Sequence, residues 1–261
     1  MSHSLRAALF ATIAVAGFAT TSDAATLHVL GMDNKIAHVD TDARKVTGAM
    51  TVSGVDGKLV GVAVRPADGK LYGLTDMGQI VSIDAAGKAT QVSRLNEKLE
   101  TGGRTAIRFN PVVDRLRVVG MNGANYRINV DNGQVTTDKK LAYADGSTGA
   151  GQQPMVTAAA YTNAMAGAKE TALYTLDPRL GQVNLQTPPN DGVQQPKANA
   201  GMALPYGVGF DFLTDANGGN WGFIIAAGKL HSYSVADAKI TTLGPIAGFN
   251  WTEVLGVAAT K

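Results

Sequence analysis

A short apolar strand pattern recurs five times along the chain, and this recurrence is the feature that most restricts the possible folds. The copies begin at Leu27, Leu71, Leu116, Leu173 and Trp221, so that successive starts lie 44 to 57 residues apart. Each copy is followed by a turn and further strands, and four of the five are preceded by a strand of small apolar residues. Four short strands in a repeat of about 40–50 residues are typical of one blade of a β-propeller.

The two ends of the chain indicate how this array closes. The first copy, at Leu27, lacks the preceding strand, whereas the chain ends with Leu255-Gly-Val-Ala-Ala259, which resembles Val60-Gly-Val-Ala-Val64. A C-terminal strand that completes the N-terminal blade would leave no exposed sheet edge at the seam. The sequence therefore predicts an all-β fold, a five-bladed β-propeller over residues 25–261 as a single domain, with the C-terminal strand completing the N-terminal blade.

Turn residues separate the predicted strands. In the segment Phe109–Gly120, Asn110-Pro111 ends one strand and Asp114 lies in a tight turn before the next, because proline fixes its own φ and restricts the residue before it. Segments 142–154, 163–168 and 187–200 are rich in Gly, Pro, Asn and Gln, and we interpret them as long surface loops.

The N-terminus has the pattern of a secretory signal peptide. Arg6 gives a positive start, Ala7 to Ala19 is mostly apolar but too short for a membrane span, and Ser22-Asp-Ala24 offers small residues for cleavage. We expect residues 1–24 to be removed after about Ala24, and the mature protein to be exported, to the periplasm or the exterior. No later stretch is long and apolar enough for a transmembrane segment.

Composition excludes several kinds of site. The chain has no cysteine, which excludes disulfides, zinc–thiolate sites, iron–sulfur clusters and thiol nucleophiles. A net charge of +2 does not indicate nucleic acid as a partner. The 31 glycines and only 17% charged residues fit strands joined by tight turns.

Several segments together resemble a known family. They are, in order, Gly61–Pro66, Leu71–Leu74, Phe109–Val119, Ala160–Asn163, Leu173–Asp177 and Pro188–Gly192. With these motifs the chain is similar, from about Leu27 to the C-terminus, to the bacterial family that carries domain of unknown function 4394. In that family Arg-Pro typically follows Gly-Ile-Asp-Phe, whereas Val62-Ala-Val64 precedes Arg65 here, so the acidic residue is absent. The resemblance implies an exported bacterial propeller-like protein and brings no established activity with it.

Arginines are concentrated in one part of the chain, where residues 104–127 hold five of the ten. Arg115 and Arg117 share one face of a strand, and Arg127 can approach Arg117 from the next strand. These like charges need Asp114, Asp131 or an external anion between them, and guanidinium groups suit carboxylate or phosphate ligands. The candidate ligand-binding residues are Arg104, Arg108, Asn110, Asp114, Arg115, Arg117 and Arg127. The alternative is that these arginines pair with Asp114 and nearby carbonyls and only fix the turns of the blade.

No pattern in the sequence indicates a catalytic residue, a metal site or a cofactor. His28, His38 and His231 lack the spacing of metal ligands, although His28 and His38 can meet across a hairpin. Asp40-Thr-Asp42 and Asp131-Asn-Gly133 do not complete a calcium loop and read as turns. Gly146-Ser-Thr-Gly149 and Gly207-Val-Gly209 do not complete nucleophile or dinucleotide motifs.

The sequence favours an exported, non-catalytic propeller of the bacterial envelope that binds a small anionic ligand or an envelope protein. This hypothesis predicts a central opening with few titratable groups. The alternative is a propeller enzyme, such as a calcium-dependent lactonase-like hydrolase or a quinone-dependent dehydrogenase. A hydrolase would need acidic and amide ligands on the inner strands, which instead carry Val62, Val64, Ile107, Ala158, Ala160 and Val208. A third hypothesis is a module for adhesion or envelope assembly.

Overall fold

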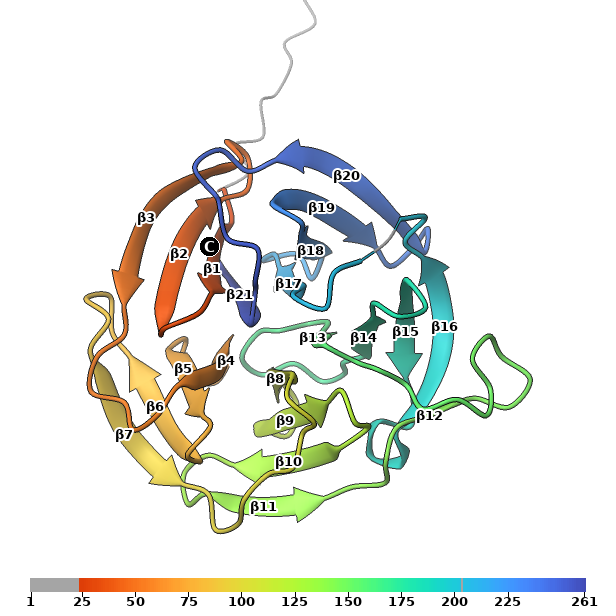
Figure 1. The fold of residues 1–261 in the computed structure, drawn as a ribbon, viewed down its shortest axis with the longest axis horizontal. Coiled ribbons are helices and arrows are strands. Elements are labelled where there is room, and N and C mark those ends of the chain that lie inside the picture. The colour runs from red at the N-terminus through yellow and green to blue at the C-terminus, as the bar shows by residue number, and fades with distance from the viewer. Residues whose placement is uncertain (1–23, 203) are drawn as a thin grey trace, which may run out of the picture.

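The computed structural model describes residues 24–202 and 204–261 and consists almost entirely of β-strands. Five small sheets stand around a common axis like the blades of a wheel (Figure 1). This confirms the predicted five-bladed β-propeller. The predicted signal peptide falls on residues 1–24, nearly all of it outside the described residues. No helix in residues 24–202 and 204–261 is long and apolar enough to cross a membrane.

Each blade has four antiparallel strands, numbered here from the axis outward, and blade 4 has a fifth. Blade 1 consists of β21 (Gly256–Thr260), β1 (Thr26–Leu30), β2 (Lys35–Asp40) and β3 (Lys45–Thr51). Blade 2 consists of β4 (Leu59–Val64), β5 (Leu71–Thr75), β6 (Gln79–Ile83) and β7 (Ala89–Arg94). Blade 3 consists of β8 (Thr105–Asn110), β9 (Arg115–Gly120), β10 (Asn125–Asn129) and β11 (Gln134–Thr137).

The two remaining blades lie between blade 3 and the closing seam. Blade 4 consists of β13 (Ala158–Tyr161), β14 (Leu173–Asp177), β15 (Gln182–Gln186), β16 (Val193–Asn199) and β12 (Ala142–Tyr143), with the short 3-10 helix η1 (Pro189–Asp191) between β15 and β16. Blade 5 consists of β17 (Gly209–Thr214), β18 (Asn220–Ala226), β19 (Lys229–Ser234) and β20 (Lys239–Pro245).

The C-terminal strand β21 closes the ring by pairing with β1. Leu27 lies opposite Ala259 and Leu30 opposite Gly256, and the Leu255 N–H donates to the Leu30 carbonyl at 2.8 Å. Figure 1 shows β21 beside β1, close to the axis. The predicted closure is therefore confirmed. The hydrogen bonds of this seam join residues that are more than 200 positions apart in the chain.

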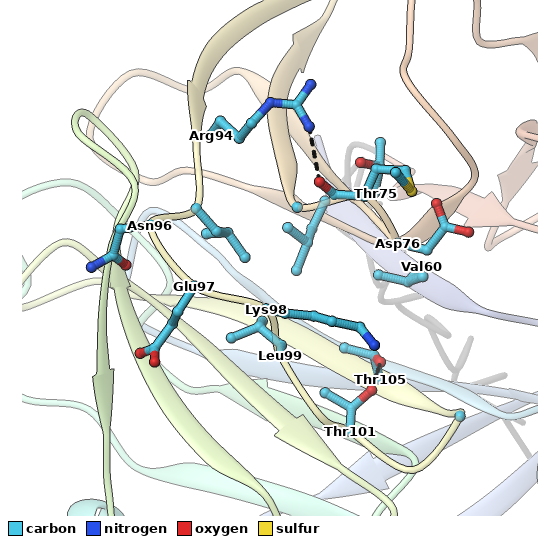
Figure 2. Close-up of a pocket in the computed structure, with 15 residues that line it drawn as sticks. Val60, Thr75, Asp76, Arg94, Asn96, Glu97, Lys98, Leu99, Thr101 and Thr105 are labelled. Atoms are coloured by element: carbon cyan, nitrogen blue, oxygen red, sulfur yellow. Dashed lines mark hydrogen bonds between the residues drawn. The ribbon is translucent and has the colours of Figure 1, made fainter.

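Strand directions define two faces of the ring. The turns that follow the first and third strands of each blade lie on one face. The turns after the second strand, and the connections between blades, lie on the other. On this second face, residues 95–104 connect blade 2 to blade 3 and cover a cavity that Figure 2 shows from close by.

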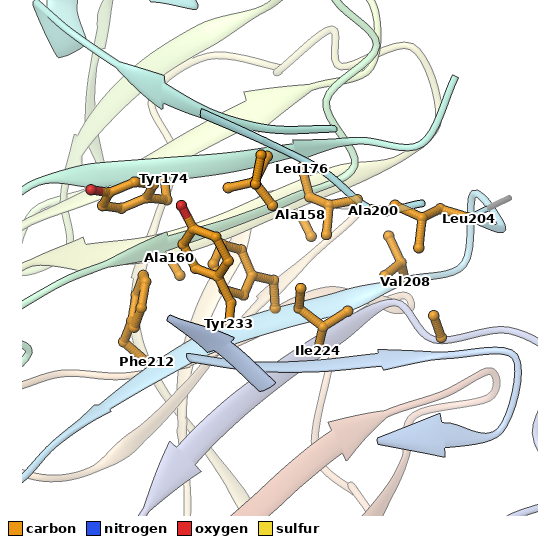
Figure 3. Packing of buried hydrophobic residues seen from close by; sticks show 14 residues of the cluster. Ala158, Ala160, Tyr174, Leu176, Ala200, Leu204, Val208, Phe212, Ile224 and Tyr233 are labelled. Atoms are coloured by element: carbon orange, nitrogen blue, oxygen red, sulfur yellow. The ribbon is translucent and has the colours of Figure 1, made fainter. Parts of the chain in front are cut away.

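Apolar side chains fill the spaces between neighbouring blades and form the core. Between blades 4 and 5, Tyr174, Phe212 and Tyr233 pack with ring centroids 5.7 to 6.2 Å apart (Figure 3). Small inner residues such as Ala158 and Ala160 leave room for these rings. Similar clusters lie between the other blades, so each blade is stable only against its neighbours.

The outer part of the interface between blades 3 and 4 is different, because it is polar. A chain of hydrogen bonds runs from Thr175 to Gln194 (2.5 Å), to Gln186 (2.9 Å), to Asn125 (3.4 Å) and to Arg117 (2.8 Å). These side chains are at most 2% exposed. Buried polar groups are stable only when they are hydrogen-bonded to one another, so this network fixes how the two blades meet.

The segment 187–200, predicted as a loop, is the main difference from the sequence-based prediction. It contains η1 and the outer strand β16, and β12 pairs with β16 in parallel as a fifth strand. The sequence did not indicate this strand, because Pro196, Lys197 and Asn199 belong to residue types that are depleted in strands. Pro196 is tolerated next to a register shift at Val183 and Asn184, where the regular ladder is interrupted.

Candidate functional site

The structure separates the seven predicted site residues into three locations: the central axis, the turn between β8 and β9, and a pocket between blades 3 and 4. Arg108 occupies the axis, and Arg104 lies at one end of it. Asp114 lies in the β8–β9 turn and pairs with an arginine of blade 2. The other four residues line the pocket: Asn110, Arg115, Arg117 and Arg127.

The guanidinium group of Arg108 lies at the centre of the ring, among the inner strands. Its Nη1 donates to the carbonyls of Val62 (3.0 Å) and Ile107 (2.7 Å), and its Nη2 donates to those of Phe210 and Val257. Its Nε lies 3.0 Å from the Asp211 carboxylate. The inner strands have a free edge toward the axis, and the guanidinium supplies donors for the carbonyls that this edge presents.

The axis therefore holds a buried ion pair where the sequence predicted an opening with few titratable groups. Asp211 is also an acceptor for the backbone N–H groups of Ala259 and Phe212. Burial raises the pKa of Asp211 and lowers that of Arg108, while each charge opposes the effect on its partner. Both Nη atoms of Arg108 donate to backbone carbonyls and its Nε lies beside Asp211, which gives Arg108 a structural role in this conformation.

Further ion pairs link blades and explain the positions of Arg104 and Asp114. Arg104 pairs with Glu253 and donates to the Val254 carbonyl (2.8 Å), so it bridges the end of the axis from blade 3 to the segment before β21. Arg65 of blade 2 donates to both carboxylate oxygens of Asp114, and to Asp131 at 3.1 Å. The hydrogen bonding of Arg65 to the Asp114 carboxylate is the main reason that the pKa of Arg65 is raised.

Arg117 and Arg127 do meet across adjacent strands, as their positions predicted. The anion between them is Asp138, and neither Asp114 nor Asp131 takes this place. Asp138 lies 2.5 Å from Arg117 Nη1 and accepts from Arg127 Nε (2.8 Å) and Nη2 (2.9 Å). Asp138 follows β11 in an irregular segment, so no strand periodicity pointed to it.

Arg117 is held by further contacts that leave it almost no exposed surface. Its Nη1 also donates to Asn125 (2.8 Å), its Nη2 to Asn190 (2.6 Å), and its Nε to the Tyr161 hydroxyl (3.4 Å). Asn190 comes from η1, which sequence reasoning took for part of a loop. These contacts connect the pocket to the polar network between blades 3 and 4.

We call the cavity above these residues the arginine pocket. It has a volume of about 400 Å3 and lies on the face that carries the turns after first and third strands. Its wall consists of Asn110, Val113, Arg115, Arg117, Arg127, Tyr161, Pro189 and Asn190. Three arginines and one carboxylate, Asp138, give this region an excess of two positive charges.

The hydrogen-bonding groups of the arginine pocket are unequally used. Its acceptors are occupied: Asp138 by two arginines, the Asn110 amide oxygen by the N–H groups of Val112 and Val113, and the Asn190 oxygen by Arg117. The donors are not all occupied. Arg115 donates only through Nη1, to the carbonyls of Val113 and Asp114, and Arg127 makes no hydrogen bond through Nη1 within the described residues. The pocket therefore offers donors to a ligand.

A second, larger cavity lies on the opposite face. We call it the interblade cavity; its volume is about 540 Å3, between blades 2 and 3 beneath residues 95–104 (Figure 2). Val60, Leu74, Leu95 and Leu99 form an apolar floor. In Figure 2, Asp76 and Glu97 lie on different sides of the cavity.

His28 and His38 meet across the hairpin of blade 1, with their Nδ1 atoms 3.0 Å apart. His28 Nε2 lies 3.1 Å from the Thr260 hydroxyl of the closing strand. Burial, and secondly the His38 charge, lower the pKa of His28 to about 4. In residues 24–202 and 204–261, no three side chains of His, Asp or Glu are grouped so that they could hold a metal ion.

Comparison with solved structures shows the same kind of fold in distant proteins. A structural genomics protein of unknown function from Bacteroides thetaiotaomicron is 19% identical, with a TM-score of 0.54, over 90% of this chain and 68% of that one. Glutaminyl cyclase from Myxococcus xanthus is 12% identical, with a TM-score of 0.54, over 83% of this chain and 86% of that one. At these identities the likeness concerns the fold alone.

An auxiliary nutrient binding protein from Bacteroides ovatus is 18% identical, with a TM-score of 0.43, over 74% of this chain and 54% of its own. A TM-score of this size supports no conclusion about function.

No curated protein matches the sequence. The profile of one family, described as domain of unknown function (DUF4394), matches residues 35–258. This match covers most of the chain, from β2 into β21, and the protein therefore belongs to the DUF4394 family.

Proposed function

We propose that this protein is an exported, non-catalytic binding protein whose arginine pocket takes a small anionic ligand. The observation that carries the proposal is the excess of donors in this pocket. Its acceptors are occupied by protein groups, whereas Arg115 and Arg127 keep N–H groups without partners within the described residues. An anion, which accepts hydrogen bonds and donates none, is the ligand that such a wall suits.

The rigidity of the pocket also supports binding. Asp138 holds Arg127 through two hydrogen bonds, and Arg117 behind it is fixed by three further side chains. A guanidinium that is already oriented loses less conformational entropy when a ligand arrives. The turn that carries Arg115 is fixed as well, because Asp114 within it binds Arg65 of the neighbouring blade.

The size of the pocket indicates a ligand larger than a simple oxyanion. A volume of about 400 Å3 lies within the range of small-molecule sites, which is about 300–1,000 Å3. Val113, Pro189 and the ring of Tyr161 offer apolar surface beside the guanidinium groups. We therefore expect an organic anion, with a carboxylate or phosphate group at Arg115 and Arg127.

Export remains a proposal that rests on the sequence. Arg6, the apolar residues Ala7 to Ala19 and the small residues before Ala25 fit a cleaved signal peptide. Mass spectrometry of the protein recovered from its native host tests this: a mature N-terminus near Ala25 supports export, and an intact N-terminus in the cytoplasmic fraction contradicts it.

Isothermal titration calorimetry of the mature protein tests the binding function. The probes are phosphate, citrate, benzoate and glucuronate, measured at low and at high salt. We expect at least one organic anion to bind, with weaker binding at high salt, since screening reduces exposed charge interactions. Arg115→Gln should weaken binding about tenfold or more, because a hydrogen bond to a charged group contributes about 1.5–3 kcal/mol.

Arg94→Gln is the matched control, because Arg94 is a partly exposed arginine on the opposite face whose removal changes the net charge equally. Equal effects of the two substitutions would show a general charge effect and contradict a site at the arginine pocket. Absence of binding by all four probes at low salt would also contradict it.

A further inference from the structure

The interblade cavity is larger than the arginine pocket, and the proposed function does not use it. It lies over the apolar cluster between blades 2 and 3, on the face opposite the arginine pocket. Val60, Leu95 and Leu99 pack with one side on this cluster and turn the other side to the cavity. Its volume of about 540 Å3 is within the range of small-molecule sites.

The segment that covers this cavity, residues 95–104, is fixed at both ends to blade 3. At its start, the N–H of Asn96 donates to the Gly133 carbonyl (3.1 Å), and its side-chain oxygen accepts from the Val135 N–H (3.0 Å). Near its end, the Glu100 carbonyl accepts from the Asn122 side chain at 3.0 Å. A Cβ on Gly120 would collide with the Thr101 carbonyl, so the close approach there requires glycine. The cover is therefore a built part of blade 3.

The charges at the rim of the cavity are not balanced. Its two cations already have partners: Arg94 lies 2.7 Å from Asp56 and also binds the Met77 carbonyl (Figure 2), and Lys98 lies 3.1 Å from Glu100. The carboxylates of Asp76 and Glu97 form no ion pair within the described residues. Asp76 accepts only the backbone N–H of Lys58 at 2.8 Å. Arg94 and Lys98 are balanced by Asp56 and Glu100, so the carboxylates of Asp76 and Glu97 leave the rim with an excess of two negative charges.

We propose that the interblade cavity is a second binding site, for a small amphipathic cation with an apolar body and an ammonium group. The body would cover the aliphatic floor, since burial of apolar surface is favourable in water. The ammonium group would lie at the rim, beside either Asp76 or Glu97, which line different sides of the cavity (Figure 2). This site selects the opposite charge from the arginine pocket, so the two faces bind different ligands.

Three probes that share a phenylalkyl body and carry a positive, a neutral or a negative head group test this proposal: 4-phenylbutylamine, 4-phenylbutanol and 4-phenylbutyrate. Calorimetry with the mature protein should give the tightest binding for the amine, about fivefold tighter than for the alcohol. In the double variant Asp76→Asn, Glu97→Gln this preference should disappear. The matched control is Asp145→Asn, Glu170→Gln, which removes two exposed carboxylates elsewhere and should leave the preference unchanged.

A second variant, Leu99→Trp, fills the cavity and should abolish binding of amine and alcohol while the circular dichroism spectrum stays native. Phenylbutyrate can also bind at the arginine pocket, and Arg115→Gln separates that contribution. The proposal is overturned if the amine and alcohol bind equally, if the double variant keeps the preference, or if folded Leu99→Trp protein still binds the amine. Loss of anion binding in Arg115→Gln with unchanged amine binding shows that the two sites are independent.

Discussion

Arg117 and Arg127 lie opposite each other on neighbouring strands, and the carboxylate of Asp138 separates their guanidinium groups. Two like charges in register would repel each other. Asp138 pairs with both guanidinium groups, which offsets this repulsion and holds both groups in place. Arg117 is buried, while Arg127 remains about one-third exposed. The arrangement places one positive charge at the wall of the pocket and one behind it.

Asp138→Asn should strongly destabilise the protein. The substitution leaves Arg117 buried beside Arg127 without a counter-charge, and loss of one partner of a buried ion pair costs about 3–5 kcal/mol. Urea denaturation measures this change. Asp191→Asn is the control, because Asp191 forms an exposed pair with Lys139 whose contribution is about 0–1 kcal/mol. Similar losses in both variants would show that Asp138 is not buried in an ion pair.

Arg108→Met should also reduce the free energy of unfolding, by about 3–5 kcal/mol, because Asp211 would be left buried without its partner. The carbonyls of Val62, Phe210 and Val257 would lose their donor in the same substitution. Arg108→Met with Asp211→Asn should cost less than the sum of the single changes, since the two residues interact directly. Strict additivity in urea denaturation would contradict the ion pair at the axis.

Stability should decrease as the pH falls from about 6.5 to about 4. The pKa of His28 is about 4 in the folded protein and 6.5 in the unfolded chain, so the unfolded state binds the proton more readily. The contribution of neutral His28 is complete above pH 6.5 and is lost as the pH falls toward 4. The difference between 6.5 and about 4 corresponds to about 3 kcal/mol.

His28→Gln should make the pH dependence of stability shallower over this range, as thermal unfolding at successive pH values would show. Burial also lowers the pKa values of His38 and His231, so a smaller slope should remain. An unchanged slope in His28→Gln would contradict the burial of His28 in its neutral form.

Thr26→Cys with Thr260→Cys should form a disulfide on oxidation, because the two residues lie directly opposite each other in the closing strand pair. The natural chain has no cysteine, so any disulfide in the double variant identifies this pair. Directly opposed residues of antiparallel strands have Cα separations of about 4.5–5.5 Å, which a disulfide can span. Failure to oxidise in folded protein, detected by mass spectrometry, would contradict the closure.

The fold could be predicted from the sequence because each blade is encoded locally. Alternation along short strands, the turn residues between them and the matching ends at Val60–Val64 and Leu255–Ala259 are all readable along the chain. The outer strand β16 was missed since its residues, including Pro196, have low strand propensity. Its place is fixed by pairing with β15 and β12, which is a tertiary effect that overrides propensity.

The candidate site was predictable only in part. The approach of Arg127 to Arg117 follows from hairpin register, which local sequence gives. Asp138 and Asn190 come from an irregular segment and from η1, and their positions depend on how blades 3 and 4 meet. The role of Arg108 depends on carbonyls of Val62, Phe210 and Val257, which converge only when the ring has closed.

The most direct test of the arginine pocket is an NMR titration that observes the Nε–Hε signals of the arginine side chains. The ligand is the organic anion that binds tightest by calorimetry, added to the mature protein at low salt. We expect the signals of Arg115 and Arg127 to shift with a common affinity, while those of Arg94 and Arg179 stay in place. Shifts of equal size at all exposed arginines, or none at Arg115 and Arg127, would contradict the account.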